Sequence, residues 1–120
     1  MIRVERCPDA MTAALMQHAD MVLYPATGDG SGMTVLQAMR AGARLIACKS
    51  GAVFELAGAT PFYCEADNAI SLLQVMRRLL DETSDEYEKR RQMARSLVLD
   101  CTWERCGKKI LSAVKRSLLR

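Results

Sequence analysis

The sequence predicts an α/β fold in which a parallel sheet is flanked by helices. Two short apolar runs, MVLYP (21–25) and RLIACK (44–49), are typical of buried strands in parallel sheets. Segments with helical spacing precede and separate these runs, and from residue 67 onward the pattern is wholly helical. Strands that alternate with helices indicate parallel pairing, because parallel strands need a long crossover connection.

The first half of the chain is expected to carry the whole sheet. IRVE (2–5) suits a short first strand, and PFYC (61–64) suits the strand that follows RLIACK. Pro8 suits the first turn of a helix that runs to about Ala19. A second helix follows the glycine-rich loop and ends at Gly42, with its apolar stripe at Val35, Leu36, Met39 and Ala43. SGA (50–52) is expected to turn the chain.

Three helices are expected in the second half. Asp67 is the predicted cap of a helix that ends near Leu80, with an apolar stripe at Ile70, Leu73, Met76 and Leu80. Thr83 and Glu86 have the spacing of a capping box that opens a charged helix over 86–100. Thr102 is the predicted cap of the last helix, whose apolar stripe is Trp103, Ile110, Leu111, Val114 and Leu118.

Length and composition favour a single small unit. A chain of 120 residues, half of them apolar, can bury one core, so residues 1–120 are expected to form a single partial domain that ends in helices over about 84–120. The 17 basic and 14 acidic residues nearly balance, and no aromatic residues alternate with basic ones, which argues against nucleic acid as a partner. The sequence lacks a transmembrane run and the apolar core of a signal peptide, so a cytoplasmic protein is expected.

The five cysteines do not form a metal-binding pattern. Their number is odd, no C-x-x-C pair occurs, and His18 is the single histidine available to join them. We therefore expect no structural metal, and interpret the cysteines as buried thiols in a reducing compartment.

The most distinctive segment is YPATGDGSGMTVLQAMRAG (24–42), in which Gly28, Gly30 and Gly32 fall within five residues. The loop lies between the end of a predicted strand and the start of a helix, where ligands of open α/β sheets bind. A helix N-terminus favours an anion, most often phosphate. The spacing is not G-x-G-x-x-G, because Val35 replaces the third glycine, and no P-loop lysine follows. The glycines alone are equally compatible with a turn that needs positive φ.

Further residues make the segment similar to a known family. The order P-A-x-G-D-G-x-G-x-x-x-L-Q-A-M-x-A-G, then R-L-I-A, then S-G-A-V-F-E closely resembles the donor-binding half of GT-B glycosyltransferases of the group 1, or family 4, type. FYCEADNAISLLQVMRRLL and CTWERCGKKIL are similar to later elements of that family, so the resemblance covers nearly all of the chain. It implies a Rossmann-like sheet that forms part of the C-terminal GT-B domain.

The resemblance also implies a role for each loop residue. Asp29 matches the first acid of the family's paired-acid motif and, with Gly30, would bind the donor sugar. The donor diphosphate would meet the backbone of Ser31, Gly32, Met33 and Thr34. Gln37 replaces the second acid, which accepts hydrogen bonds from the nucleotide ribose, so the charge-assisted bond is lost here. The family's G-G-x-x-E region falls on Lys49, Ser50, Gly51 and Glu55, which a turn plus a helix cap would equally explain.

The implied activity is transfer of a sugar from a nucleotide-diphosphate sugar to a glycan or lipid-linked acceptor, with retention of configuration and with no metal or other cofactor. The family's acceptor domain and diphosphate-neutralising basic pair do not match this sequence, so the chain is expected to be a fragment or split subunit, inactive alone. The alternative is a non-catalytic α/β binding or assembly module whose donor loop has decayed. Self-association or a partner half is expected to cover its apolar surface.

The last helix carries six basic residues and one acidic residue between Trp103 and Arg120. Such a helix could hold the protein at the inner face of an anionic membrane, as a peripheral contact. The preferred interpretation is that its apolar stripe packs on the missing acceptor domain while its basic residues remain in water.

Overall fold

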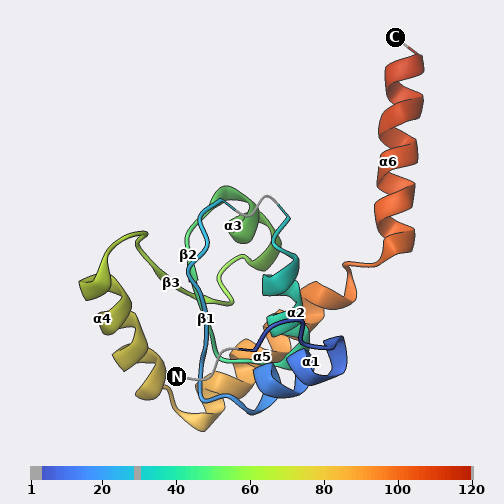
Figure 1. The fold of residues 1–120 in the computed structure, drawn as a ribbon. Coiled ribbons are helices and arrows are strands. Elements are labelled where there is room, and N and C mark those ends of the chain that lie inside the picture. Colours follow the sequence, from blue (N-terminus) through green and yellow to red (C-terminus); the bar gives the residue numbers. More distant parts are fainter. Residues whose placement is uncertain (1–3, 29–30, 120) are drawn as a thin grey trace.

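The computed structural model describes residues 4–28 and 31–119. Within these residues, three short parallel strands form the sheet, and helices cover both of its faces (Figure 1). The elements, in chain order, are α1 (Asp9–His18), β1 (Val22–Tyr24), α2 (Met33–Ala41), β2 (Leu45–Cys48), α3 (Gly51–Ala57), β3 (Phe62–Cys64), α4 (Ala69–Leu80), α5 (Ser84–Leu99) and α6 (Trp103–Leu118). The predicted α/β class and the Rossmann-like parallel sheet are confirmed.

The sheet is built around β2, which pairs in parallel with β1 on one side and β3 on the other. All four residues of β2 are buried. Because successive side chains point to opposite faces, Leu45 and Ala47 enter one core cluster while Ile46 and Cys48 enter the other. Two-sided burial explains why β2 reads as a continuous apolar run.

The first face of the sheet packs against α2, α3 and α5. Val35, Ala38 and Met39 of α2 are fully buried there, with Val53 and Ala57 of α3. Ala94 and Val98 of α5 complete this cluster. The predicted α2 stripe is therefore correct at its central positions, and α2 ends at Gly42, whose φ of 75° is in the left-handed region.

The second face is covered mainly by α4. Val75 and Leu79 of α4 pack against Phe62 and Cys64 of β3. Leu23, at the middle of β1, is 45% exposed to solvent. The expectation that the MVLYP strand is buried is thus wrong for Leu23, because the strand lies at an edge of the described sheet.

Two expectations in the first half are corrected. Val4 and Glu5 are not in a strand, while Ile2 and Arg3 of the predicted first strand lie outside the described residues. Residues 50–52 do not simply turn the chain: Ser50 caps α3, accepting a hydrogen bond from Val53 N at 3.4 Å. A serine that can satisfy a first-turn N–H favours a helix start over an open turn.

The predicted start and stripe of α4 are also corrected. Asn68, not Asp67, is the cap; its side chain accepts from Ser71 N, and Asp67 has a φ of 53°. Of the predicted stripe, Ile70, Leu73 and Leu80 are exposed, and the buried positions are Val75 and Leu79. Leucines occur on several sides of this helix, so spacing alone did not identify the face that meets β3.

The last two helices begin as the sequence predicts. Thr83 and Glu86 form the capping box, although α5 begins at Ser84 rather than Glu86. Thr102 caps α6 by accepting from Arg105 N at 3.2 Å. Every residue of α6 is exposed, and the helix stands away from the rest of the molecule (Figure 1). Its apolar stripe therefore has no cover within the described chain.

Candidate functional site

The glycine-rich loop leads from the carboxyl end of β1 to the N-terminus of α2, as predicted. Gly32 is the residue before the helix; it is buried and has a φ of 63°. A β-carbon at this position would lie 2.6 Å from Leu56 Cδ1 of α3. The left-handed backbone at this position thus favours glycine, and the missing β-carbon lets the Leu56 side chain approach closely.

The residues assigned to the donor diphosphate lie at the start of α2. Met33 N donates a hydrogen bond to Ser31 Oγ at 3.5 Å, and both residues are exposed. Thr34 is half-buried. Gly32 offers no side chain to cap this helix end, and a helix N-terminus attracts negative charge. The arrangement leaves a surface that an anion can approach.

The two residues assigned to the donor sugar, Asp29 and Gly30, lie outside the described residues. Gln37, assigned to the ribose, lies one helical turn into α2 and is exposed, away from the buried Val35 and Ala38. The structure places Gln37 on the same helix as the proposed diphosphate contacts.

The segment after β2 lies beside this loop, because Gly32 contacts Leu56 of α3. Ser50 is a helix cap, which the plainer of the two interpretations expected. Lys49 is exposed, and its Nζ lies 4.8 Å from the centre of the Phe54 ring. Gly51 and Glu55 are exposed on α3. Lys49 is therefore a cation near the carboxyl edge that the sequence did not single out for diphosphate.

A larger hollow lies at the carboxyl ends of all three strands, on the face that α4 covers. Its volume is about 380 Å³, within the range of small-molecule sites. Its lining includes Tyr24 at the end of β1, Pro25 just after it, Cys48 of β2 and Cys64 of β3. We did not predict this hollow from the sequence, although three apolar runs that end at the same edge of a parallel sheet indicate where it lies.

A hydrogen-bonded rim closes one side of the hollow. Asn68 Nδ2 donates to Glu65 Oε2 at 2.6 Å, Glu65 N donates to Ser71 Oγ at 3.0 Å, and Ser71 N donates to Asn68 Oδ1 at 2.9 Å. The three residues hold the end of β3 against the start of α4. The rim thus places polar groups in fixed positions at the edge of a hollow whose lining is largely apolar.

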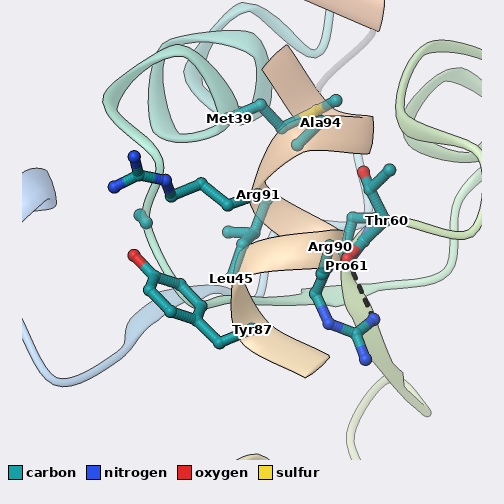
Figure 2. A pocket seen from close by; sticks show the side chains of 9 residues that line it. Met39, Leu45, Thr60, Pro61, Tyr87, Arg90, Arg91 and Ala94 are labelled. Carbon is teal, nitrogen blue, oxygen red and sulfur yellow. Dashed lines mark hydrogen bonds between the residues drawn. The ribbon is translucent and has the colours of Figure 1, made fainter. Parts of the chain in front are cut away.

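A second cavity, at the amino ends of the strands, is too small for a substrate. Figure 2 shows it between α5 and the segment around Pro61; its free volume is about 10 Å³, about that of one water molecule. Arg90 Nη1 donates to Thr60 O at 3.2 Å and its Nε pairs with Glu82 at 2.7 Å. These groups fasten α5 to the sheet and do not form a ligand site.

The described residues contain no cluster of His, Cys, Asp or Glu side chains suited to a metal ion. In the same part of the chain, no helix has the length and apolar character needed to cross a membrane.

A parallel sheet with a glycine-rich strand-to-helix loop at its carboxyl edge defines the class of α/β proteins that bind ligands at that edge. The family model described as "Glycosyl transferases group 1" matches residues 3–82, two thirds of the chain. The chain belongs to this family, as its resemblance to the GT-B donor-binding part predicted. No curated protein and no solved structure matches it. The family match ends before α5 and α6.

Proposed function

We propose that this chain is the donor-binding portion of a retaining glycosyltransferase, and that it holds a nucleotide-diphosphate sugar at the N-terminus of α2. The observation that supports this most is Gly32, which is buried, left-handed and in close contact with α3 at the helix start that the resemblance assigns to the donor diphosphate. The left-handed turn at Gly32 leads directly into the first turn of α2, and the N–H groups of a helix start favour an anion.

In this proposal the residues of the loop and of α2 contact different parts of the donor. The helix start and Ser31–Thr34 backbone would stabilise the departing diphosphate, which makes a metal unnecessary. Asp29 would accept hydrogen bonds from sugar hydroxyls, and Gln37 from the ribose. Lys49 adds a nearby cation that could approach the diphosphate. Transfer also needs an acceptor-binding wall, so the 120-residue chain by itself is expected to turn over no nucleotide sugar.

The apolar stripe of α6 is proposed to pack on the part that supplies this wall. Every residue of the stripe is exposed, whereas a glycosyltransferase of this type works in a cleft between two domains. The basic residues on the other side of the helix would remain in water. Binding of α6 to an anionic membrane is the competing use of this helix.

The test introduces a negative charge where the diphosphate would bind. Ser31→Asp retains an acceptor for the Met33 N–H and places an acid at the helix start, so the fold should tolerate it. Ser84→Asp is the matched control, because it adds the same charge at the start of a different helix, α5. Calorimetric titration with nucleotide diphosphates should show roughly tenfold weaker binding for Ser31→Asp and no change for Ser84→Asp.

A second candidate, a non-catalytic binding or assembly module, is favoured by one feature. Gln37 stands where the family has an acid, so the strongest ribose contact is missing. If nucleotide diphosphates and nucleotide sugars fail to bind the chain with or without its partner half, the module is the better description.

A further inference from the structure

Cys48 and Cys64 form a pair of thiols at the carboxyl edge of the sheet. They are the last residues of β2 and β3 and are partners in the parallel register. Their sulfur atoms are 3.7 Å apart, and the residues are only 3% and 7% exposed. The pairing follows from the fold, because both side chains point to the face that α4 covers.

The pair is buried but lies at the wall of a hollow. Both cysteines line the 380 Å³ hollow beyond the strand ends. A molecule the size of a peroxide can therefore reach the sulfurs from this side without unfolding the sheet. The expectation that the cysteines are buried is correct for this pair and wrong for Cys101 and Cys106, which are exposed; Cys7 is half-buried.

We propose that Cys48 and Cys64 are a modification site, a dithiol that hydrogen peroxide converts into an intrachain disulfide between β2 and β3. The Cys48 thiolate attacks one peroxide oxygen, the O–O bond breaks, and the departing hydroxide takes a proton to become water. The resulting sulfenic acid is attacked by the Cys64 sulfur, which forms the S–S bond and releases a second water. Two thiols and one peroxide thus give one disulfide and two waters.

The order of attack follows from the surroundings of Cys64. Burial, together with the hydrogen bond and the charge of Cys48, raises the pKa of Cys64 to about 11. Its sulfur also lies 3.7 Å from Ala47 O, an acceptor for the thiol proton. Cys64 is thus a poor first nucleophile at neutral pH and is suited to the second step, in which the target sulfur is already held beside it.

The backbone can accept the bond. Neighbouring strands lie about 4.8 Å apart, which is inside the Cα separation of about 4.4–6.8 Å found for disulfides. The sulfurs must approach by somewhat less than 2 Å to reach a bonding distance of about 2.05 Å. The bond would form at the final pair of the two strands, where neighbouring loops can adjust, and would link the start of the α3 segment to the rim at Glu65.

The experiment is peptide mapping of the folded, reduced chain after treatment with a few equivalents of hydrogen peroxide and blocking of remaining thiols. Trypsin places Cys48 on peptide 45–49 and Cys64 on peptide 50–77, each without another cysteine. We expect these two peptides to be joined, with a mass about 2 Da below their sum, and separated again by dithiothreitol. Dilute protein keeps the reaction within one chain.

Variants assign the bond. Cys48→Ala and Cys64→Ala should each abolish the joined peptide, whereas Cys101→Ala/Cys106→Ala, the matched control, should retain it. Should either single variant fail to fold, mapping of the unsubstituted protein still decides the matter. The proposal is overturned if Cys48 and Cys64 remain alkylatable after treatment, if they reach sulfinic acid unjoined, or if only Cys7, Cys101 and Cys106 become linked.

Discussion

Gly32 lies directly against Leu56, so that a β-carbon at Gly32 would stand 2.6 Å from Leu56 Cδ1. This contact joins the start of α2 to α3 and brings the two loops at the carboxyl edge together. The conformation of the glycine-rich loop depends on Gly32, because its left-handed φ turns the chain into α2 at this point.

Gly32→Ala should therefore lower the free energy of unfolding by about 1–3 kcal/mol, from left-handed backbone strain and the clash with Leu56. Gly28→Ala is the control: among the described residues other than its chain neighbours, no atom lies within 4 Å of the added β-carbon, so a change within about 0.5 kcal/mol is expected. Urea unfolding measures both. In a double-mutant cycle, Leu56→Ala should remove the part of the destabilisation that comes from the clash. An absence of coupling between the two substitutions would contradict the contact.

Restoring the family's acid at position 37 should improve donor binding. Gln37→Glu exchanges a neutral hydrogen bond to the ribose for a charge-assisted one, worth on the order of 1 kcal/mol. Nucleotide-sugar binding to the chain completed by its partner half should tighten roughly fivefold to tenfold by calorimetric titration. An unchanged affinity would show that Gln37 does not bind the ribose.

Removing the first acid should discriminate between two ligands. Asp29→Ala should weaken binding of the nucleotide sugar but leave the bare nucleotide diphosphate nearly unaffected, because only sugar hydroxyls lose a partner. The two ligands are titrated against the same variant. Equal weakening of both would mean that Asp29 acts on the loop as a whole, and no weakening of either would favour the decayed module.

The capping box gives a prediction with a pH dependence. Hydrogen bonds from Thr83, first from its backbone N–H and then from its side chain, hold the pKa of Glu86 below its usual value of 4.5. The ionised carboxylate therefore stabilises the fold at neutral pH, and this contribution is lost as the pH falls below about 4.5 and through the folded pKa.

Glu86→Gln should accordingly flatten the fall in unfolding free energy on acidification, as measured by urea titrations between neutral and acidic pH. Thr83→Ala should cost about 1 kcal/mol at neutral pH, since it removes the cap of α5. Ser96→Ala, at an exposed position later on α5, is the control and should change neither quantity. An equally steep acid limb in Glu86→Gln would show that other carboxylates dominate.

The exposed stripe of α6 predicts a contrast between two leucines. Leu79 is 0% exposed in the core, so Leu79→Ala should destabilise the chain by about 2–5 kcal/mol. Leu111 is 55% exposed, and Leu111→Ala should change the stability of the dilute monomer by no more than about 0.5 kcal/mol. At high concentration the same Leu111→Ala change should reduce self-association and dye binding, because it removes part of the stripe.

Light scattering against concentration checks the second half of this prediction. A compact monomer at high concentration that binds no hydrophobic dye would contradict the expected need for a cover. Flotation with anionic vesicles separates the membrane alternative: flotation that is lost when Lys108, Lys109, Lys115 and Arg116 become glutamine would favour the membrane over a partner half.

The sequence by itself determined the order and type of most elements. MVLYP, RLIACK and PFYC are short apolar runs bounded by Gly, Pro or polar residues, and these local patterns are enough to predict strands. Thr83 and Thr102 identified helix starts, because a cap is a contact between residues close in sequence. The glycine-rich loop and its family resemblance likewise came from adjacent residues.

Only the tertiary structure decided which surfaces meet. Leu23 lies on an edge strand, and α4 turns Val75 and Leu79 rather than Ile70 and Leu73 toward β3. Cys48 and Cys64 are 16 residues apart, yet their sulfurs lie 3.7 Å from each other. Such outcomes depend on how strands pair and which helix covers which face. The free energy of these contacts comes from residues distant in sequence, so no local pattern records it.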